Sequence, residues 1–171
     1  RPPYPSTNGF RGLPTVVNNV ETLCSVPAIV ERGAQWYRSI GTAHSPGTKV
    51  FTVTGHVRQP GAFEAPFGIT LRQVIFQFAG GMRSGSQFKA ALTGGAAGTV
   101  VGEESLDIPL DFASFRQGVS LGSGGILIVD QTVRIPDLLG WVLRFFEVES
   151  CGKCTPCREG TREARIIIDR L

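Results

Sequence analysis

The chain has 171 residues, of which 42% are hydrophobic and only 18% are charged, and its formal net charge at pH 7 is +3. This composition is typical of a packed globular protein and excludes a chain that is disordered throughout. Residues 151–171 contribute +2 of the net charge, which is too small a basic patch to predict nucleic-acid binding. No hydrophobic run is long enough for a membrane span, so we expect a soluble, cytoplasmic protein, or one at the cytoplasmic face of a membrane-associated complex.

The first residues predict an extended segment followed by helices. Residues 1–14, RPPYPSTNGFRGLP, are rich in proline and glycine, which favours a segment laid over other protein. A helix is expected next, with Asn18 as its cap and Glu21 at the spacing of a capping box. Pro27 is expected to interrupt it, so that residues 28–40 form one or two further short helices.

The middle of the chain changes to a strand-like pattern. Residues 48–57, TKVFTVTGHV, alternate, and RQPG turns the chain into a second expected strand at 62–68. Thr70 can then cap a helix over 71–79 with an apolar stripe. Further strands are predicted at 89–93 and 125–130. A hairpin, a helix and later strands predict a small α+β roll.

Two later segments complete the pattern. Residues 135–150, IPDLLGWVLRFFEVES, are apolar nearly all round and predict a buried helix, in which Trp141, Phe145 and Phe146 pack a bundle. The glycine-rich run TGGAAGTVVG at 93–102 lacks the ending of a phosphate loop and predicts a surface loop. His44 and His56 are expected at loop and strand-end positions without a catalytic role.

Cys151, Cys154 and Cys157 form the spacing C-x2-C-x2-C in the stretch ESCGKCTPCREG. Disulfides fit poorly, because three close thiols leave one unpaired and a short loop would be strained. Soft thiolate ligands favour an iron–sulfur cluster or, as the alternative, zinc; redox thiols are a third possibility. Thr155 followed by Pro156 is expected to begin a helix.

A tetrahedral site needs a fourth ligand, and position 161 is Thr where a ferredoxin-type run would continue with Cys. Cys24 is the other cysteine, but its apolar helical context, ETLCSVP, predicts a packed thiol. We therefore expect the fourth ligand beyond Leu171, in a longer protein of which this chain is an internal section. The basic side chains near the thiols could stabilise a reduced cluster, although a solvated helix face is an equal alternative for Arg165; these side chains are Lys153, Arg158, Arg162 and Arg165.

Three motifs in this order and spacing resemble the NADH-oxidising flavoprotein subunit shared by respiratory complex I, NAD-reducing hydrogenases and NAD-dependent formate dehydrogenases. They are TVVNNVETL, GTKVFTVTGHVRQPGAFEAPFGITLRQVI and ESCGKCTPCREGT. The resemblance implies an α+β fold: the helical tail of an FMN- and NADH-binding domain at 1–45, a β-grasp domain of the soluble-ligand-binding type at 46–130, and the start of a helical [4Fe–4S] bundle at 131–171.

The resemblance also implies the site residues. Cys151, Cys154 and Cys157 match three ligands of the [4Fe–4S] cluster. The family's flavin-contacting stretch matches the residues Val17, Asn18, Asn19 and Thr22. The glycine-rich loop for flavin and nucleotide is expected upstream, so most of the FMN and NAD(H) sites would lie outside this chain.

The function expected from the resemblance is electron transfer between NAD(H), FMN and the cluster, in which the cofactors carry the chemistry. The expected partners are the remaining parts of the flavoprotein subunit and iron–sulfur subunits of a multisubunit complex, with no nucleic acid. Residues 46–130 would then serve as a spacer between flavin and cluster. The alternative is a non-catalytic β-grasp module that binds a ligand or a partner and carries a structural zinc site.

Overall fold

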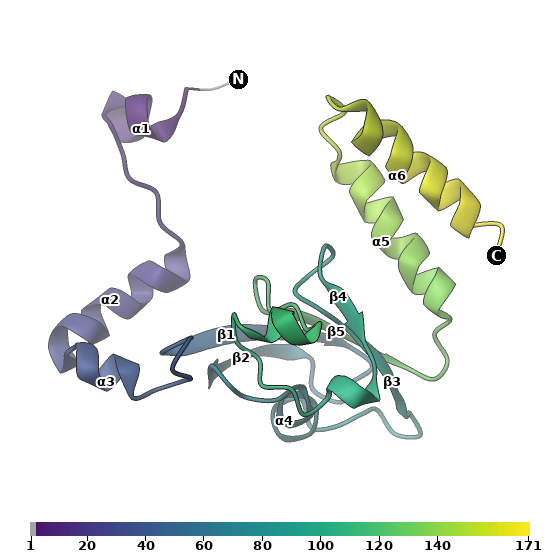
Figure 1. Ribbon diagram of the computed structural model, residues 1–171, viewed down its shortest axis with the longest axis horizontal. Helices are drawn as coiled ribbons and strands as arrows, with labels where there is room; N and C mark the ends of the chain where they lie inside the picture. The colour runs from purple at the N-terminus through teal and green to yellow at the C-terminus, as the bar shows by residue number, and fades with distance from the viewer. Residues whose placement is uncertain (1–2) are drawn as a thin grey trace.

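The computed structural model describes residues 3–171 and shows a sheet from which two helical arms rise (Figure 1). The first arm contains α1 (Pro5–Asn8), a 3-10 turn at Phe10–Gly12, α2 (Val20–Arg32) and α3 (Ala34–Arg38). The second arm is a hairpin of α5 (Ile135–Glu149) and α6 (Thr155–Ile168). The first arm lies beyond one end of the sheet, and the second rises from the other end (Figure 1).

The sheet has five strands in the order β2-β1-β5-β3-β4. The strands are β1 (Thr48–Gly55), β2 (Gly61–Pro66), β3 (Phe88–Thr93), β4 (Thr99–Val101) and β5 (Gly125–Asp130). The central pair β1 and β5 is parallel, whereas the other neighbours are antiparallel. The mixed α/β architecture agrees with the expected strands at 48–57, 62–68, 89–93 and 125–130.

Alternation along β1 decides which face of the sheet is buried. Phe51 and Val53 point into the core, while Val50, Thr52 and Thr54 are exposed. Gly55 ends the strand with φ +94°, and a Cβ there would lie 2.0 Å from the carbonyl oxygen of Ile128, so close pairing with β5 requires glycine.

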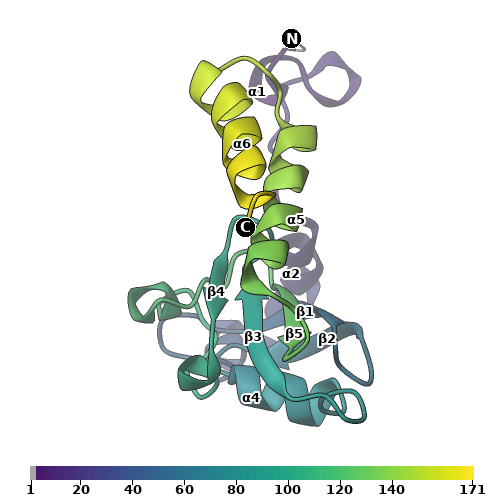
Figure 2. The same ribbon diagram turned by 90° about the vertical axis from the view of Figure 1, so that its right-hand side faces the viewer.

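A helical segment covers the inner face. It consists of α4 (Leu71–Gln73), capped by Thr70 in a capping box with Gln73, and a π-helical turn at Val74–Phe78. Its buried side chains Leu71, Val74 and Ile75 join the core formed by the strands. Figure 2 shows this segment on the side of the sheet opposite to α5. The predicted helix at 71–79 is therefore confirmed, with a π-helical second half.

Five expectations about the helices and strands were wrong. The first is the extended segment at 1–14, because its described part contains α1 and a 3-10 turn. The cap of α2 is Asn19, because its Oδ1 accepts the N–H of Glu21 at 2.8 Å. Pro27 lies inside α2 and does not end it; the carbonyl of Leu23, four residues earlier, can bond to water because this part of the helix is exposed. The glycine-rich run contains the short strand β4, which pairs with β3.

The fifth correction concerns α5, which is not a buried helix. Only Leu138 is buried, in a small cluster with Ala90 and Val129 on the outer face of the sheet. Trp141 and Phe145 are 58% and 49% exposed, because α6 covers only part of the helix surface. Among residues 3–171, no helix combines the length and apolarity that crossing a membrane requires.

Candidate iron–sulfur and flavin-contacting sites

The three cysteines lie at the turn between α5 and α6. Cys151 follows the end of α5, Cys154 is the N-cap residue of α6, and Cys157 lies in its first turn. The helix begins at Thr155, as the sequence predicted. Cys154 is the cap, so Pro156 is the second helical residue. The spacing of three brings the thiols onto the tip of the hairpin, the part of the second arm farthest from the sheet (Figure 1).

Local hydrogen bonds shape this turn. Gly152 has φ +71°, a left-handed conformation that glycine adopts without strain, and its N–H donates to Ser150 Oγ. Arg158 closes the loop, because its guanidinium donates to the carbonyl oxygen of Gly152 at 2.7 Å. Ser150 Oγ also lies 3.5 Å from Cys157 Sγ.

All three thiols are free and exposed. Within residues 3–171, no three His, Cys, Asp or Glu side chains stand close enough together to hold a metal ion. The chemistry of the donor set nevertheless fits a cluster: three soft ligands border a helix N-terminus, whose first N–H groups have no acceptor within the helix and can bond to anionic sulfur. These residues could supply three of the four ligands that a tetrahedral site needs.

The fourth cysteine does not complete the set. Cys24 lies on α2 in the first arm, and Figure 1 shows this helix on the opposite side of the molecule from the α5–α6 hairpin. The expectation of a packed thiol is also wrong for this structure, because Cys24 is exposed on a helix without buried residues.

The basic residues near the thiols divide into two groups. Arg165 binds Glu147 of α5 and Asp169, both at 2.6 Å, so its charge is neutralised and it joins the two helices of the hairpin. Hydrogen bonding to Glu147 raises the pKa of Arg165. Lys153 and Arg162 are exposed and have no ion pair in the described part of the chain. These two can therefore add positive potential at the turn.

The expected flavin-contacting residues lie together at the start of α2. Val17 and Asn18 are in the extended segment before the helix, Asn19 is its cap and Thr22 is in its first turn. All four are exposed, and no hydrogen bond within residues 3–171 occupies the side chains of Asn18 or Thr22. Their amide and hydroxyl groups are thus available to a ligand.

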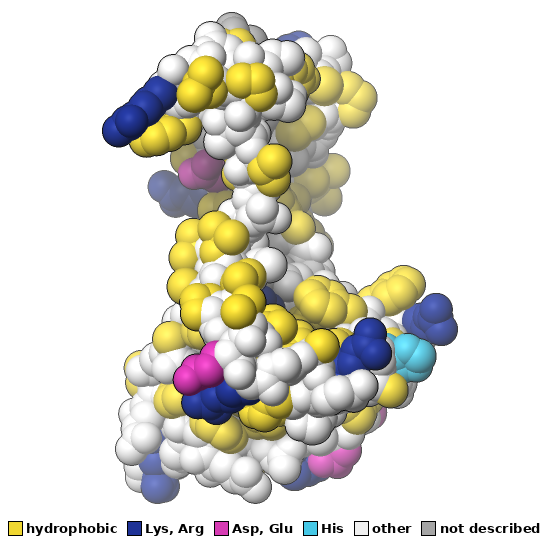
Figure 3. Space-filling view, turned by 90° about the vertical axis from the view of Figure 1, so that its left-hand side faces the viewer, with side chains coloured by type: hydrophobic (Ala, Val, Ile, Leu, Met, Phe, Trp, Pro, Cys, Tyr) yellow, Lys and Arg dark blue, Asp and Glu magenta, His cyan; other side chains and the backbone are white. Residues whose placement is uncertain are grey.

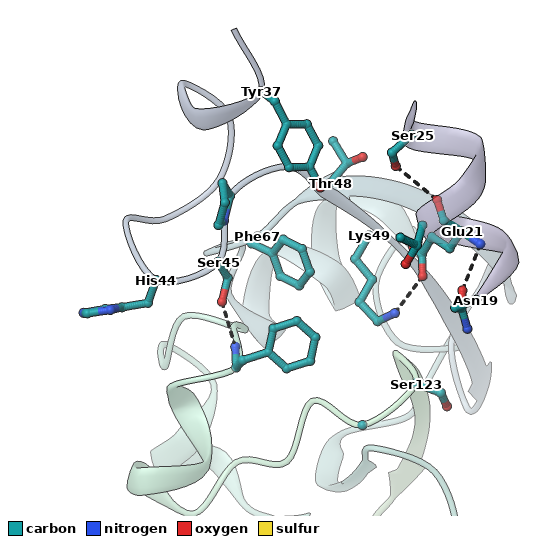
Figure 4. A pocket seen from close by; sticks show the side chains of 14 residues that line it. Asn19, Glu21, Ser25, Tyr37, His44, Ser45, Thr48, Lys49, Phe67 and Ser123 are labelled. Carbon is teal, nitrogen blue, oxygen red and sulfur yellow. Dashed lines mark hydrogen bonds and ion pairs between the residues drawn. The ribbon is translucent and has the colours of Figure 1, made fainter. Parts of the chain in front are cut away.

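The sequence predicted no site role for Glu21, which the structure makes prominent. Its carboxylate binds Lys49 Nζ at 2.9 Å (Figure 4) and also accepts the N–H of Val50 at 2.6 Å, and both residues lie on β1. Burial raises the pKa of Glu21, but the bonds from Val50 and Lys49 outweigh this effect, so the pKa lies below its ordinary value. A capping box would have directed Glu21 back to its own helix; only the fold reveals the contact with the sheet.

His56 contributes to a polar cluster that joins the end of β1 to the end of β5. Its Nδ1 lies 3.0 Å from Asp130 Oδ1 and accepts the N–H of Asp130. The carboxylate of Asp130 in turn accepts hydrogen bonds from the hydroxyl groups of Ser86 and Thr132. These contacts place His56 at a strand end, as expected; His44 is exposed in a loop at the pocket between α2 and the sheet.

Two regions of the chain match models of known protein families. Residues 137–171 match the family model "NADH-ubiquinone oxidoreductase-F iron-sulfur binding region", and residues 50–102 match the SLBB domain. The F 2 subunit of the NADH-quinone oxidoreductase of Rhizobium meliloti (strain 1021) is 45% identical over 161 residues, which cover 94% of this chain and 38% of the relative. The HndC subunit of the NADP-reducing hydrogenase of Solidesulfovibrio fructosivorans is 43% identical, over 100% of this chain and 35% of its own length.

The backbone agrees with these relatives. A crystal structure of an NAD+-reducing [NiFe]-hydrogenase in the air-oxidized state superposes with a TM-score of 0.82 at 40% identity, over 99% of this chain and 29% of that chain. The chain thus spans little more than a third of the curated relatives that it matches. The chain thus carries an SLBB match followed by an iron–sulfur binding match, and along its whole length it is similar to part of the NADH-quinone oxidoreductase F subunits and of the related hydrogenase subunits.

Proposed function

We propose that this chain is the part of an NAD-linked oxidoreductase subunit that connects a flavin site to a [4Fe–4S] cluster. In this proposal electrons pass between NAD(H), FMN and the cluster within a multisubunit complex on the cytoplasmic side. The partners would be the rest of the flavoprotein subunit and iron–sulfur subunits. The relatives' names, which denote NADH-quinone oxidoreductase and NADP-reducing hydrogenase subunits, support this class of reaction.

The observation that carries the proposal is the group of three free thiols at the tip of the α5–α6 hairpin, within the matched iron–sulfur region. Cys151, Cys154 and Cys157 would be cluster ligands, with the fourth outside this chain. A bound cluster supplies a one-electron carrier. The chain's own contribution is to hold the thiols at the start of α6, where N–H groups and the free cations Lys153 and Arg162 favour added negative charge.

The flavin-contacting role is assigned to Val17, Asn18, Asn19 and Thr22. The first turn of α2 offers side-chain donors together with the positive end of a helix dipole, which suits the phosphate group of FMN. Most of the FMN site and the NAD(H) site would lie upstream of this chain.

The domain division that we propose is 1–45 for the tail of the flavin domain, 46–130 for a β-grasp domain and 131–171 for the start of the cluster bundle. Residues 1–2 lie outside the described residues. The start of β1 at Thr48, the end of β5 at Asp130 and the strand order, with α4 in the connection from β2 to β3, support these limits and the β-grasp label. The β-grasp domain would act as the spacer between the two cofactors.

The test uses the full-length subunit with Cys151→Ser, Cys154→Ser and Cys157→Ser combined. We expect loss of the cluster's electron paramagnetic resonance signal and of iron and acid-labile sulfide, because serine is a poor ligand for these metals. Cys24→Ser is the matched control and should keep a full signal. A normal signal in the triple variant would refute the ligand assignment, and stoichiometric zinc in colourless protein prepared anaerobically would favour the structural zinc alternative.

A further inference from the structure

We propose that Glu21 is a positioning residue through which the sheet fixes the flavin-contacting turn of α2. The residue itself touches no cofactor in this proposal. It ties the turn to β1, so that the sheet sets the position of the neighbouring donors. This inference rests on the flavin role proposed above for Asn18, Asn19 and Thr22.

The main chain and the side chain of Glu21 act in different directions. Its backbone N–H donates to Asn19 Oδ1 at 2.8 Å, which fixes the cap of α2. Its carboxylate binds β1 through both oxygens, Oε2 to Lys49 Nζ and Oε1 to the N–H of Val50. One residue therefore links a proposed flavin contact to the sheet, and Thr22 follows it directly in the chain.

The N–H of Val50 needs this carboxylate. The N–H of Thr52 on β1 donates to the carbonyl oxygen of Gly124, and the N–H of His56, just after β1, donates to that of Ile128 on β5. The pairing of the two strands begins at Thr52 and Gly125, so Val50 lies one step before β5 starts. Glu21 Oε1 takes the place of the strand carbonyl that is missing there, at 2.6 Å.

Lys49 also depends on Glu21. The residue is buried, and its side chain is only 10% exposed. Its ion pair within the described residues is the one with Glu21. A buried ammonium group without its partner is costly, so removing the carboxylate would leave both a buried charge and an unpaired N–H.

Packing does not replace this contact. No residue of α2 or α3 is fully buried, so apolar packing holds the first arm on the sheet only weakly. A pocket of about 470 Å³ lies between α2 and the sheet beside the ion pair, with Asn19, Thr22, Tyr37 and Ser123 among its lining residues (Figure 4). Further contacts lie at the loop before β1, where the ring of Tyr37 lies against Gly47 and the hydroxyl of Thr42 donates to Asp111 at 2.9 Å. The start of α2 is therefore positioned chiefly by Glu21.

The test compares Glu21→Ala and Glu21→Gln in the full-length subunit within its complex. For Glu21→Ala we expect FMN binding to be weaker by about tenfold. This is the effect of losing one hydrogen bond to a charged group, here a bond that positions the protein donors that contact FMN. Glu21→Gln should lie between, because its amide oxygen can still accept the N–H of Val50. The FMN dissociation constant and the flavin midpoint potential should change while the cluster signal per protein stays constant, which a general loss of folding would not produce.

Glu31→Gln is the matched control, since Glu31 lies exposed on the same helix and has no ion pair in the described structure. If Glu21→Ala and Glu21→Gln bind FMN as tightly as Glu31→Gln does, the inference is wrong. If Glu21→Ala does not accumulate as folded protein, Glu21→Gln alone decides: weaker FMN binding with a normal cluster signal supports the inference, and unchanged binding overturns it.

Asn18→Ala and Thr22→Ala separate this inference from the proposed function. If these variants leave FMN binding unchanged, the flavin role of the turn fails and the positioning role fails with it. If they weaken FMN binding and the Glu21 variants do not, only the positioning role is overturned.

Discussion

The sheet and the two helical arms are held together in different ways. Among residues 3–171, every buried hydrophobic residue but one lies between Phe51 and Val129, the exception being Leu138. The arms instead expose apolar side chains. Figure 3 shows those on the side of the molecule that carries the first arm. The sheet has its own core, whereas the arms carry the proposed cofactor residues and contribute a single buried hydrophobic side chain, Leu138.

This difference separates stability from function along the chain. The hydrophobic effect stabilises the sheet in proportion to the apolar area that it buries. The thiols of the hairpin and the donors of α2 are exposed, because ligands must reach them. A substitution in the sheet should therefore change the free energy of unfolding, and one in the arms should change cofactor binding.

The largest effect on stability is expected from Phe51→Ala in the centre of β1. This side chain is 1% exposed, and its removal should lower the free energy of unfolding by about 3–5 kcal/mol through lost burial and a residual cavity. Phe145→Ala is the matched change in the second arm, at a ring that is 49% exposed. Urea unfolding followed by circular dichroism would measure both, and equal losses would contradict the division between sheet and arms.

A smaller, pH-dependent effect is expected at Asp130, where the sheet meets the second arm. Hydrogen bonds from Thr132 and Ser86 hold the pKa of this carboxyl far below its ordinary value. A carboxyl whose pKa is lowered by folding stabilises the folded state at pH values above its unfolded pKa. This stabilisation is lost as the pH falls toward the folded pKa. Unfolding free energy should therefore decrease below about pH 4, where an unperturbed aspartate takes up a proton.

Asp130→Asn should flatten this acid dependence and cost about 1–3 kcal/mol at pH 7, because a charged acceptor is lost. The exposed Asp137 at the start of α5 offers the control Asp137→Asn, which should keep the slope of the wild type. Unfolding curves between about pH 2 and 7, where carboxylates titrate, would compare the acid dependence of the two variants with that of the wild type. An unchanged slope in Asp130→Asn would assign the acid sensitivity to other carboxylates.

The smallest effect is expected from Arg165→Gln within the second arm. The substitution removes the ion pairs to Glu147 and Asp169, so α6 should open more often while the sheet is unaffected. Hydrogen exchange should rise in α6 and stay constant in β5, and high salt should reduce the difference from the wild type. Arg162→Gln, on the same helix without an ion pair in the described chain, should exchange like the wild type; equal exchange in both variants would show that the pairs do not hold the hairpin.

Local patterns in the sequence were sufficient for four of the five strands and for the candidate ligands. The alternation at 48–57, the turn RQPG and the cap at Thr70 specify a hairpin and a helix through backbone geometry that neighbouring residues control. The spacing of Cys151, Cys154 and Cys157 likewise predicts a soft-metal site without reference to the fold, because ligands so close in sequence need only a turn to face one centre.

Only the tertiary structure decided how distant segments meet. The parallel pairing of β1 with β5 and the strand β4 depend on partners far along the chain, which no local pattern contains. The exposure of Cys24 and of Trp141 could not be read from their apolar surroundings, because burial depends on what packs against a helix. Glu21 shows the limit most clearly: its sequence position predicts a helix cap, but an unpaired N–H of Val50 and a buried Lys49 on β1 are better partners for its carboxylate.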